Sequence, residues 1–190
     1  MRMLCLHGMG HSGVGLRSLL EGIGRISKSP VQTMYVDAPY KHNRGWMWTP
    51  VPQYIKSKPR MNVHYLSKAF NTIDGCIETH GISHLYGFSQ GAAVVDAYMS
   101  VGKYRESIES VILDCGYEYT FDSSRPLITT PTLMIHSYND RLIPPELRPK
   151  HYASITCVAH RFGHRVHMPP SMASIVSAFV HRPRTTPENR

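Results

Sequence analysis

Short apolar runs alternate along the chain with segments whose apolar residues recur every three or four positions. The run Met3–His7 predicts a strand, and the stretch from Val63 to Ile77 predicts a helix that ends before Gly81. The same patterns predict further strands at 32–36, 82–88, 108–114, 132–137 and 155–158, and further helices near 14–23, 90–101 and 172–180. Strands that alternate with helices form a parallel sheet with helices on both faces. We therefore expect an α/β fold with a mostly parallel sheet of about six strands.

Residues 40–60 show neither the apolar run of a strand nor the three- or four-residue spacing of a helix. This stretch contains several prolines and both tryptophans, and it follows a predicted strand end at Asp37-Ala38-Pro39. Such a stretch predicts a loop or a small lid. Its aromatic residues Tyr40, Trp46 and Trp48 are candidates for a substrate-binding surface, because apolar side chains beyond a strand end are typical of ligand pockets. The alternative is a surface loop that core tryptophans hold in place.

Length and composition are those of an ordinary globular protein. The 190 residues are 42% hydrophobic and 18% charged, which suffices for a single domain that we assign to residues 1–182. Residues 183–190 form a basic end that we expect to be disordered. The formal net charge of +8 favours anionic partners. No nucleic-acid recognition motif accompanies this charge, so we expect no nucleic-acid partner.

The chain lacks the sequence signals of a secreted or membrane protein. No apolar run approaches the ~20 residues of a membrane span, and no signal peptide is apparent. The cysteines form no C-x-x-C pair; they are Cys5, Cys76, Cys115 and Cys157. Because reduced thiols are typical of intracellular proteins, we expect a cytoplasmic location.

A candidate nucleophile lies where the predicted strand 82–88 meets the next predicted helix. The sequence there is Gly87-Phe88-Ser89-Gln90-Gly91, a G-x-S-x-G pattern. A serine that projects from a sharp strand-to-helix turn requires small residues two positions before and after it. The pattern therefore predicts a nucleophile elbow with Ser89 as the nucleophile. The alternative is a glycine-rich helix start with a capping serine.

A serine hydroxyl needs a base to take its proton and an acid to orient that base. Asp140 follows the predicted strand 132–137, and the chain order Ser, Asp, His is that of hydrolases with such an elbow. Asp140 is the favoured acid. Asp114, at the end of the preceding predicted strand, is the alternative.

Three histidines follow the last predicted strand: His160, His164 and His167. His164 is the favoured base because Gly163 frees the backbone before it, and His167 is the second candidate. The three histidines also suggest a metal site. However, glycine interrupts the segment and no H-E-x-x-H motif is present, so we expect no metal and no other cofactor.

Acyl transfer creates an oxyanion, which needs amide donors. The amide of Gln90 directly follows the candidate nucleophile at a helix start and is one expected donor. The loop His7-Gly8-Met9-Gly10 is expected to supply the second through the amide of Met9. An ordinary tight turn would use the same residues.

Together these motifs resemble the small fungal-type serine hydrolases of the α/β-hydrolase superfamily. The resemblance covers nearly the whole chain and rests on Leu4-Cys5-Leu6-His7-Gly8 with Ser12-Gly13, Val36-Asp37-Ala38-Pro39, Gly87-Phe88-Ser89-Gln90-Gly91-Ala92, Asp140 before Ile143-Pro144, and Gly163-His164-Arg165-Val166. It implies an α/β-hydrolase fold, esterase or thioesterase activity, and a triad of Ser89, Asp140 and His164. Some fungal relatives release polyketide acyl chains from carrier proteins.

The chain departs from the family pattern at two places that bear on the site. His167 stands where the family usually has proline, and Asp114-Cys115-Gly116 stands where a serine-glycine pair is common. The main hypothesis is a serine hydrolase that cleaves a small-molecule acyl ester or thioester through an acyl-serine intermediate. The alternative is a catalytically weak hydrolase fold that binds a ligand or a protein partner.

Overall fold

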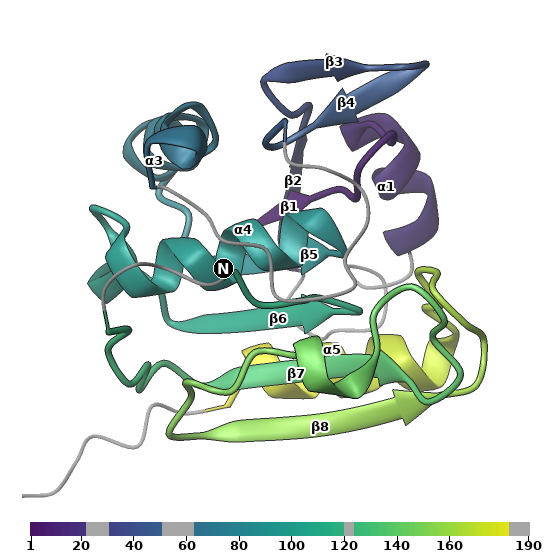
Figure 1. The fold of residues 1–190 in the computed structure, drawn as a ribbon. Coiled ribbons are helices and arrows are strands. Elements are labelled where there is room, and N and C mark those ends of the chain that lie inside the picture. The colour runs from purple at the N-terminus through teal and green to yellow at the C-terminus, as the bar shows by residue number, and fades with distance from the viewer. Residues whose placement is uncertain (22–30, 51–62, 120–123, 183–190) are drawn as a thin grey trace, which may run out of the picture.

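The structure, a computed structural model, describes residues 1–21, 31–50, 63–119 and 124–182 (Figure 1). Six parallel strands form its central sheet in the order β2-β1-β5-β6-β7-β8. The strands are β1 (Arg2–Leu6), β2 (Gln32–Val36), β5 (His84–Phe88), β6 (Ser110–Asp114), β7 (Thr132–Ser137) and β8 (Ile155–His160). The prediction of a parallel α/β sheet is confirmed. The predicted strands at 82–88 and 108–114 begin two residues later in the structure.

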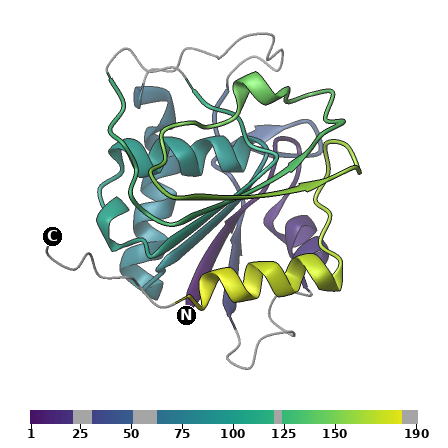
Figure 2. The same cartoon turned by 90° about the horizontal axis from the view of Figure 1, so that it is seen from below.

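Helices cover both faces of the sheet (Figure 2). Helices α3 (Ser67–His80) and α4 (Gln90–Val101) pack on one face, and α1 (Gly13–Leu20) and α5 (Pro170–Val180) pack on the other. Short 3₁₀ turns are η1 (Val63–Leu66), η2 (Arg105–Ser107) and η3 (Pro145–Leu147). Within the described ranges, no helix has the length and apolarity needed to cross a lipid bilayer.

The sheet separates two apolar cores. Along β1, Leu4 and Leu6 face the core under α3 and α4, whereas Met3 and Cys5 face the core under α1 and α5. Every residue of the central strands β5 and β6 is buried. Because both faces of these strands are covered, they read as continuous apolar runs rather than as alternating patterns.

Part of the aperiodic stretch is a small hairpin outside the main sheet. Its strands are β3 (Tyr40–His42) and β4 (Gly45–Met47), paired antiparallel, and Asn43 at the turn has a φ of 50°. Asparagine tolerates this left-handed conformation better than most residues do. The sequence predicts a loop or small lid here and gives no sign of these two strands, because strands of three residues are too short to show a period. Residues 51–60 of the predicted lid, Ile23 of the predicted first helix, and the predicted tail at 183–190 lie outside the described residues.

Two glycines allow helix α4 to start against the sheet. A Cβ atom added to Gly91 would lie 2.3 Å from the carbonyl oxygen of Leu6, and one added to Gly87 would lie 2.5 Å from the Cα of Ala92. Both clashes are with backbone, which cannot rotate away as a side chain can. The close approach of β1, β5 and α4 therefore depends on these two glycines.

We expect Gly91→Ala to lower the free energy of unfolding by about 2 kcal/mol or more, because the backbone must shift to relieve the clash. The matched control is Gly75→Ala on α3, where an added Cβ meets nothing within 4 Å. The control should be stabilising by up to about 1 kcal/mol, since alanine favours a helix interior. Urea unfolding followed by circular dichroism measures both variants, and equal effects would contradict the close approach.

Candidate active site

Ser89 occupies the sharp turn between β5 and α4. Its backbone has a φ of 53° and a ψ of −116°, a conformation that residues with side chains rarely adopt. The amide of Ser89 donates a hydrogen bond to the carbonyl of Asp114 (2.9 Å), and its own carbonyl accepts from the amide of Ala93 (3.0 Å). These bonds hold the strained turn in place. The Ser89 side chain is half-buried at the carboxyl end of β5.

The structure brings the Ser89 hydroxyl together with an imidazole and a carboxylate. His164 Nε2 lies 2.8 Å from Ser89 Oγ, and His164 Nδ1 lies 2.7 Å from Asp140 Oδ2. Asp140 follows β7 and His164 follows β8. The three side chains come from three separate loops because the carboxyl ends of parallel strands meet at one edge of the sheet.

Backbone groups fix the orientation of the Asp140 carboxylate. Its Oδ1 atom accepts hydrogen bonds from the amides of Leu142 (2.8 Å) and Ile143 (2.9 Å), which leaves Oδ2 for the imidazole. Burial opposes ionisation of Asp140, but the hydrogen bonds from His164 and from these amides outweigh it, so the Asp140 pKa lies below its usual value. The ionised carboxylate accepts the Nδ1 proton of His164. The Nε2 atom of His164 is then free to accept the proton of the serine.

Gly163 sets the course of the loop that carries the imidazole. Its φ of 72° is in the left-handed region, and its amide donates to Ser137 Oγ and Asn139 Oδ1, both at 3.0 Å. His164 follows directly and lies against the ring of Phe88, with 5.3 Å between the ring centroids. The glycine that favours His164 in the sequence therefore makes the turn that brings this histidine to the serine.

The other two histidines of the segment lie elsewhere. His167 stacks on Phe162, with 3.7 Å between the ring centroids, and its ring is 5.8 Å from that of His160. Among the described residues, the nitrogen atoms of His160, His164 and His167 do not gather as one set of metal ligands. In this geometry the imidazole beside Ser89 is His164, not His167.

Asp114, the alternative acid, lies in the core beneath the site. Its side chain is fully buried, and Oδ2 accepts a hydrogen bond from the hydroxyl of Tyr86 (2.6 Å). Burial raises the pKa of Asp114 to about 7, despite this hydrogen bond. Its Oδ1 atom has no hydrogen-bond partner in the described part of the chain. The carboxylate bonded to His164 is that of Asp140.

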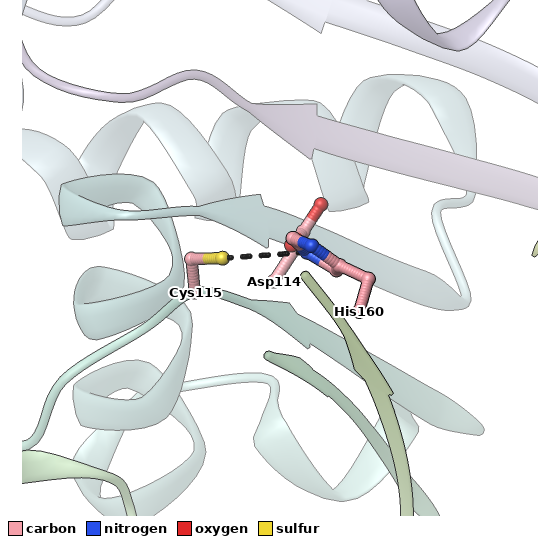
Figure 3. A group of neighbouring side chains, drawn as sticks. All are labelled: Asp114, Cys115 and His160. Atoms are coloured by element: carbon pink, nitrogen blue, oxygen red, sulfur yellow. Dashed lines mark hydrogen bonds between the residues drawn. The ribbon is translucent and has the colours of Figure 1, made fainter. Parts of the chain in front are cut away.

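Asp114, Cys115 and His160 form a second buried group (Figure 3). Their potential ligand atoms lie within 4.8 Å of one another, and Cys115 Sγ is 3.9 Å from His160 Nε2. The amide of Phe162 donates to His160 Nδ1 (3.2 Å), so the neutral ring carries its proton on Nε2, the atom that faces Cys115. A metal would require this nitrogen without its proton. The geometry fits a hydrogen-bonded cluster better than a metal centre.

The two predicted oxyanion donors belong to segments that adjoin the nucleophile. Gln90 is the first residue of α4, and Gly8 packs so closely that an added Cβ would lie 3.3 Å from the Cβ of Ser89. Met9 follows Gly8 directly. In the described part of the chain, the amides of Met9 and Gln90 have no hydrogen-bond acceptor. Their role as oxyanion donors stays a prediction.

Buried His7 shapes the loop that carries Met9. The amide of Ala38 donates to His7 Nε2 (3.1 Å), and His7 Nδ1 lies 2.7 Å from the carbonyl oxygen of Gly8, to which it donates. Burial lowers the pKa of His7, which keeps the ring neutral in this role. Two signals of this role are visible in the sequence: the position of His7 before Gly8, and the Asp37-Ala38-Pro39 motif.

The β3–β4 hairpin clamps the same loop. The amide of Gly10 donates to the carbonyl of Trp46 (2.8 Å), and the amide of Trp46 donates to the carbonyl of His11 (2.9 Å). The Gln90 side chain accepts from the amide of Trp48 (2.8 Å) and donates to the carbonyl of Thr49 (3.0 Å). The side chain of Gln90 therefore joins the segment after β4 to the start of α4. The sequence predicts a role only for the backbone amide of Gln90.

The three aromatic residues predicted to bind substrate have different surroundings. Trp48 is fully buried and donates from its indole to the carbonyl of His7 (2.8 Å). The placement of Trp48 on a substrate-binding surface is therefore corrected: its side chain is a core residue that supports the loop. Tyr40 and Trp46 are half-buried, and lysine ammonium groups lie over both rings. Their contact with substrate stays a prediction.

Several known proteins are similar to this chain in fold or, at low identity, in sequence. The solved carboxylesterase from Mesorhizobium loti is 20% identical, with a TM-score of 0.72 over 96% of this chain and 88% of that one. Arabidopsis thaliana SOBER1 is 18% identical, with a TM-score of 0.75 over 95% and 97%. Among curated proteins, Esterase OVCA2 of Danio rerio is 22% identical over 77% of this chain and 80% of the relative.

The sheet order, the covering helices and these structural neighbours define an α/β-hydrolase fold. The family model described as serine hydrolase (FSH1) matches residues 1–179. The chain belongs to this serine hydrolase family, as the resemblance of its motifs implied.

We expect Asp114→Asn to become more stable relative to the unchanged protein as pH rises from about 4 to 7. An aspartate in an unfolded chain has a pKa of about 3.9, so the folded protein binds more protons than the unfolded chain in this range. The unchanged protein therefore loses about 1.4 kcal/mol per pH unit through this group. Asparagine cannot ionise and avoids the loss. Urea unfolding at several pH values checks this, and a difference that does not vary with pH would contradict it.

Proposed function

We propose that the protein cleaves carboxylic esters or thioesters through an acyl-serine intermediate. The observation that carries this proposal is the hydrogen-bonded chain from Ser89 Oγ through the imidazole of His164 to Asp140, with distances of 2.8 and 2.7 Å. A serine needs such a base to become a nucleophile at neutral pH, and the base needs the carboxylate to fix its tautomer. Membership of a serine hydrolase family supports the same reaction class.

The first half of the reaction forms the acyl-enzyme. Ser89 Oγ attacks the carbonyl carbon while His164 Nε2 takes the hydroxyl proton. The carbonyl oxygen becomes an oxyanion that accepts hydrogen bonds from the amides of Met9 and Gln90, each worth roughly 10²–10³ in rate. His164 then gives its proton to the leaving oxygen or sulfur as the bond to the carbonyl carbon breaks.

The second half releases the acid. A water molecule gives a proton to His164 Nε2 and attacks the carbonyl carbon of the acyl group on Ser89. The bond to Ser89 Oγ breaks as His164 returns the proton to that oxygen, and the carboxylic acid leaves. Asp140 stabilises the imidazolium in both halves. No cofactor takes part in this scheme.

Kinetics of alanine variants test the roles of the serine and of the two competing histidines. We expect Ser89→Ala and His164→Ala to lower kcat on 4-nitrophenyl butyrate by roughly 10⁴-fold or more, because each removes a group that handles the transferred proton. His167→Ala is the matched control and should change kcat by less than about tenfold, since His167 contacts Phe162 rather than Ser89.

The same assay separates the two acids. Asp140→Asn should lower kcat by roughly 10⁴-fold through loss of the correct imidazole tautomer, whereas Asp114→Asn should retain most activity. Turnover that survives Ser89→Ala would contradict the acyl-serine mechanism. An unchanged protein that turns over no ester would favour the alternative of a hydrolase fold that only binds a ligand or partner.

A further inference from the structure

A hollow of about 550 Å³ has His164 among its lining residues. It is formed by the loops that follow β7 and β8, the same two loops that carry Asp140 and His164. Three of its lining residues are arginines, and we call this surface the arginine hollow; they are Arg141, Arg161 and Arg165.

The arginine hollow has a concentrated positive charge. All three arginines are exposed, and within the described ranges none of their guanidinium groups has an ion-pair or hydrogen-bond partner. Among the described residues that line the hollow, none carries a carboxylate. The nearest acid in sequence, Asp140, has a side chain only 3% exposed and is bonded to His164. Guanidinium groups bind phosphate and carboxylate through paired hydrogen bonds, so three of them around one hollow suit an anion.

The hollow has apolar walls between its charges. Leu142 is 63% exposed and Phe162 is 41% exposed, and both line the hollow. Exposed apolar side chains next to unpaired cations favour a ligand with an uncharged portion and an anionic end. The combination differs from a uniformly hydrated basic face.

The direction of proton transfer in the reaction determines which part of a substrate lies near this hollow. This step rests on the proposed function. His164 Nε2 delivers the proton to the leaving oxygen or sulfur, so that atom must approach within hydrogen-bond distance of this nitrogen. The leaving group therefore departs toward His164, one of the residues that line the hollow, whereas the acyl chain extends from the carbonyl carbon held at Ser89.

We propose that the arginine hollow binds an anionic leaving group, an alcohol or thiol that carries a phosphate or carboxylate. In the step concerned, the bond between the carbonyl carbon and the leaving oxygen or sulfur breaks, and that atom takes the proton held by His164. The anionic end stays in the hollow and is not itself changed. Arg141, Arg161 and Arg165 are the specificity-determining residues.

The test compares thioesters that share an acyl group and differ in leaving-group charge. In butyryl-coenzyme A the leaving group is a thiol that carries phosphate groups elsewhere in the molecule. In the butyryl thioester of N-acetylcysteamine the leaving thiol is neutral. A second pair moves the charge to the acyl side: mono-4-nitrophenyl glutarate against 4-nitrophenyl butyrate. The readout is the ratio of kcat/KM for the charged and neutral member of each pair, at low salt and at about 0.5 M NaCl.

Variants then assign the effect to the hollow. We expect a ratio of about ten or more for the first pair at low salt, falling at high salt. Arg161→Gln combined with Arg165→Gln should reduce this ratio at least about fivefold. Lysine at both positions should restore only part of it, because an ammonium group keeps the charge but cannot form the paired hydrogen bonds. The matched control is Arg17→Gln on the exposed side of α1, which removes one charge from another surface and should leave the ratio unchanged.

The outcomes separate the inference from the function on which it rests. A first-pair ratio near one, or a ratio that Arg17→Gln lowers as much as the double variant does, would overturn the arginine hollow while neutral esters are still hydrolysed. A preference confined to the glutarate pair would place the charge on the acyl side and overturn it as well. Failure to hydrolyse any of the four esters would overturn the proposed function.

Discussion

The reversal of the chain at Ser89 is the constraint on which the site depends. The backbone of Ser89 has a φ of 53°, a strained value that persists only when the surrounding structure fixes it. Gly91 lies against the carbonyl of Leu6, Gly8 lies against the ring of Phe88, and the carbonyl of Asp114 accepts the Ser89 amide. At this turn the hydroxyl of Ser89 lies 2.8 Å from His164 Nε2, and the amide of Gln90 has no acceptor among the residues that the structure describes.

The remaining parts of the site are arranged around that turn by hydrogen bonds between loops. Gln90 ties the segment after β4 to α4, and the hairpin clamps the loop of Met9 through Gly10 and Trp46. On the other side, the amides of Leu142 and Ile143 fix Asp140. Because these bonds fix the loops before any substrate binds, the polar atoms of the proposed site are positioned in advance, which is the condition for electrostatic catalysis.

Much of this arrangement could be predicted from the sequence because it follows from local rules. Buried parallel strands appear as apolar runs, and the glycines around Ser89 reflect a steric demand that only a sharp turn makes. The ends of parallel strands meet at one edge, so Asp140 and His164 were expected near Ser89. The preference for His164 over His167 rests on Gly163, on the position of His164 in the loop and on the family motif, and in the structure His164 lies beside the serine.

Other features depend on contacts between distant segments and have no local signal. Three-residue strands such as β3 are too short for a period, and the burial of Trp48 follows from its bond to the carbonyl of His7. The second role of Gln90, through its side chain, was equally hidden. The arginine hollow joins residues of two loops that only the pairing of β7 with β8 brings together.

Covalent labelling tests directly whether Ser89 is a nucleophile that His164 activates. A fluorophosphonate reacts with a serine that an adjacent base has activated, and mass spectrometry of the digested protein locates the adduct. We expect a single adduct on Ser89, which is lost in His164→Ala and retained in His167→Ala. An adduct on another residue, or labelling of Ser89 that persists without His164, would contradict it.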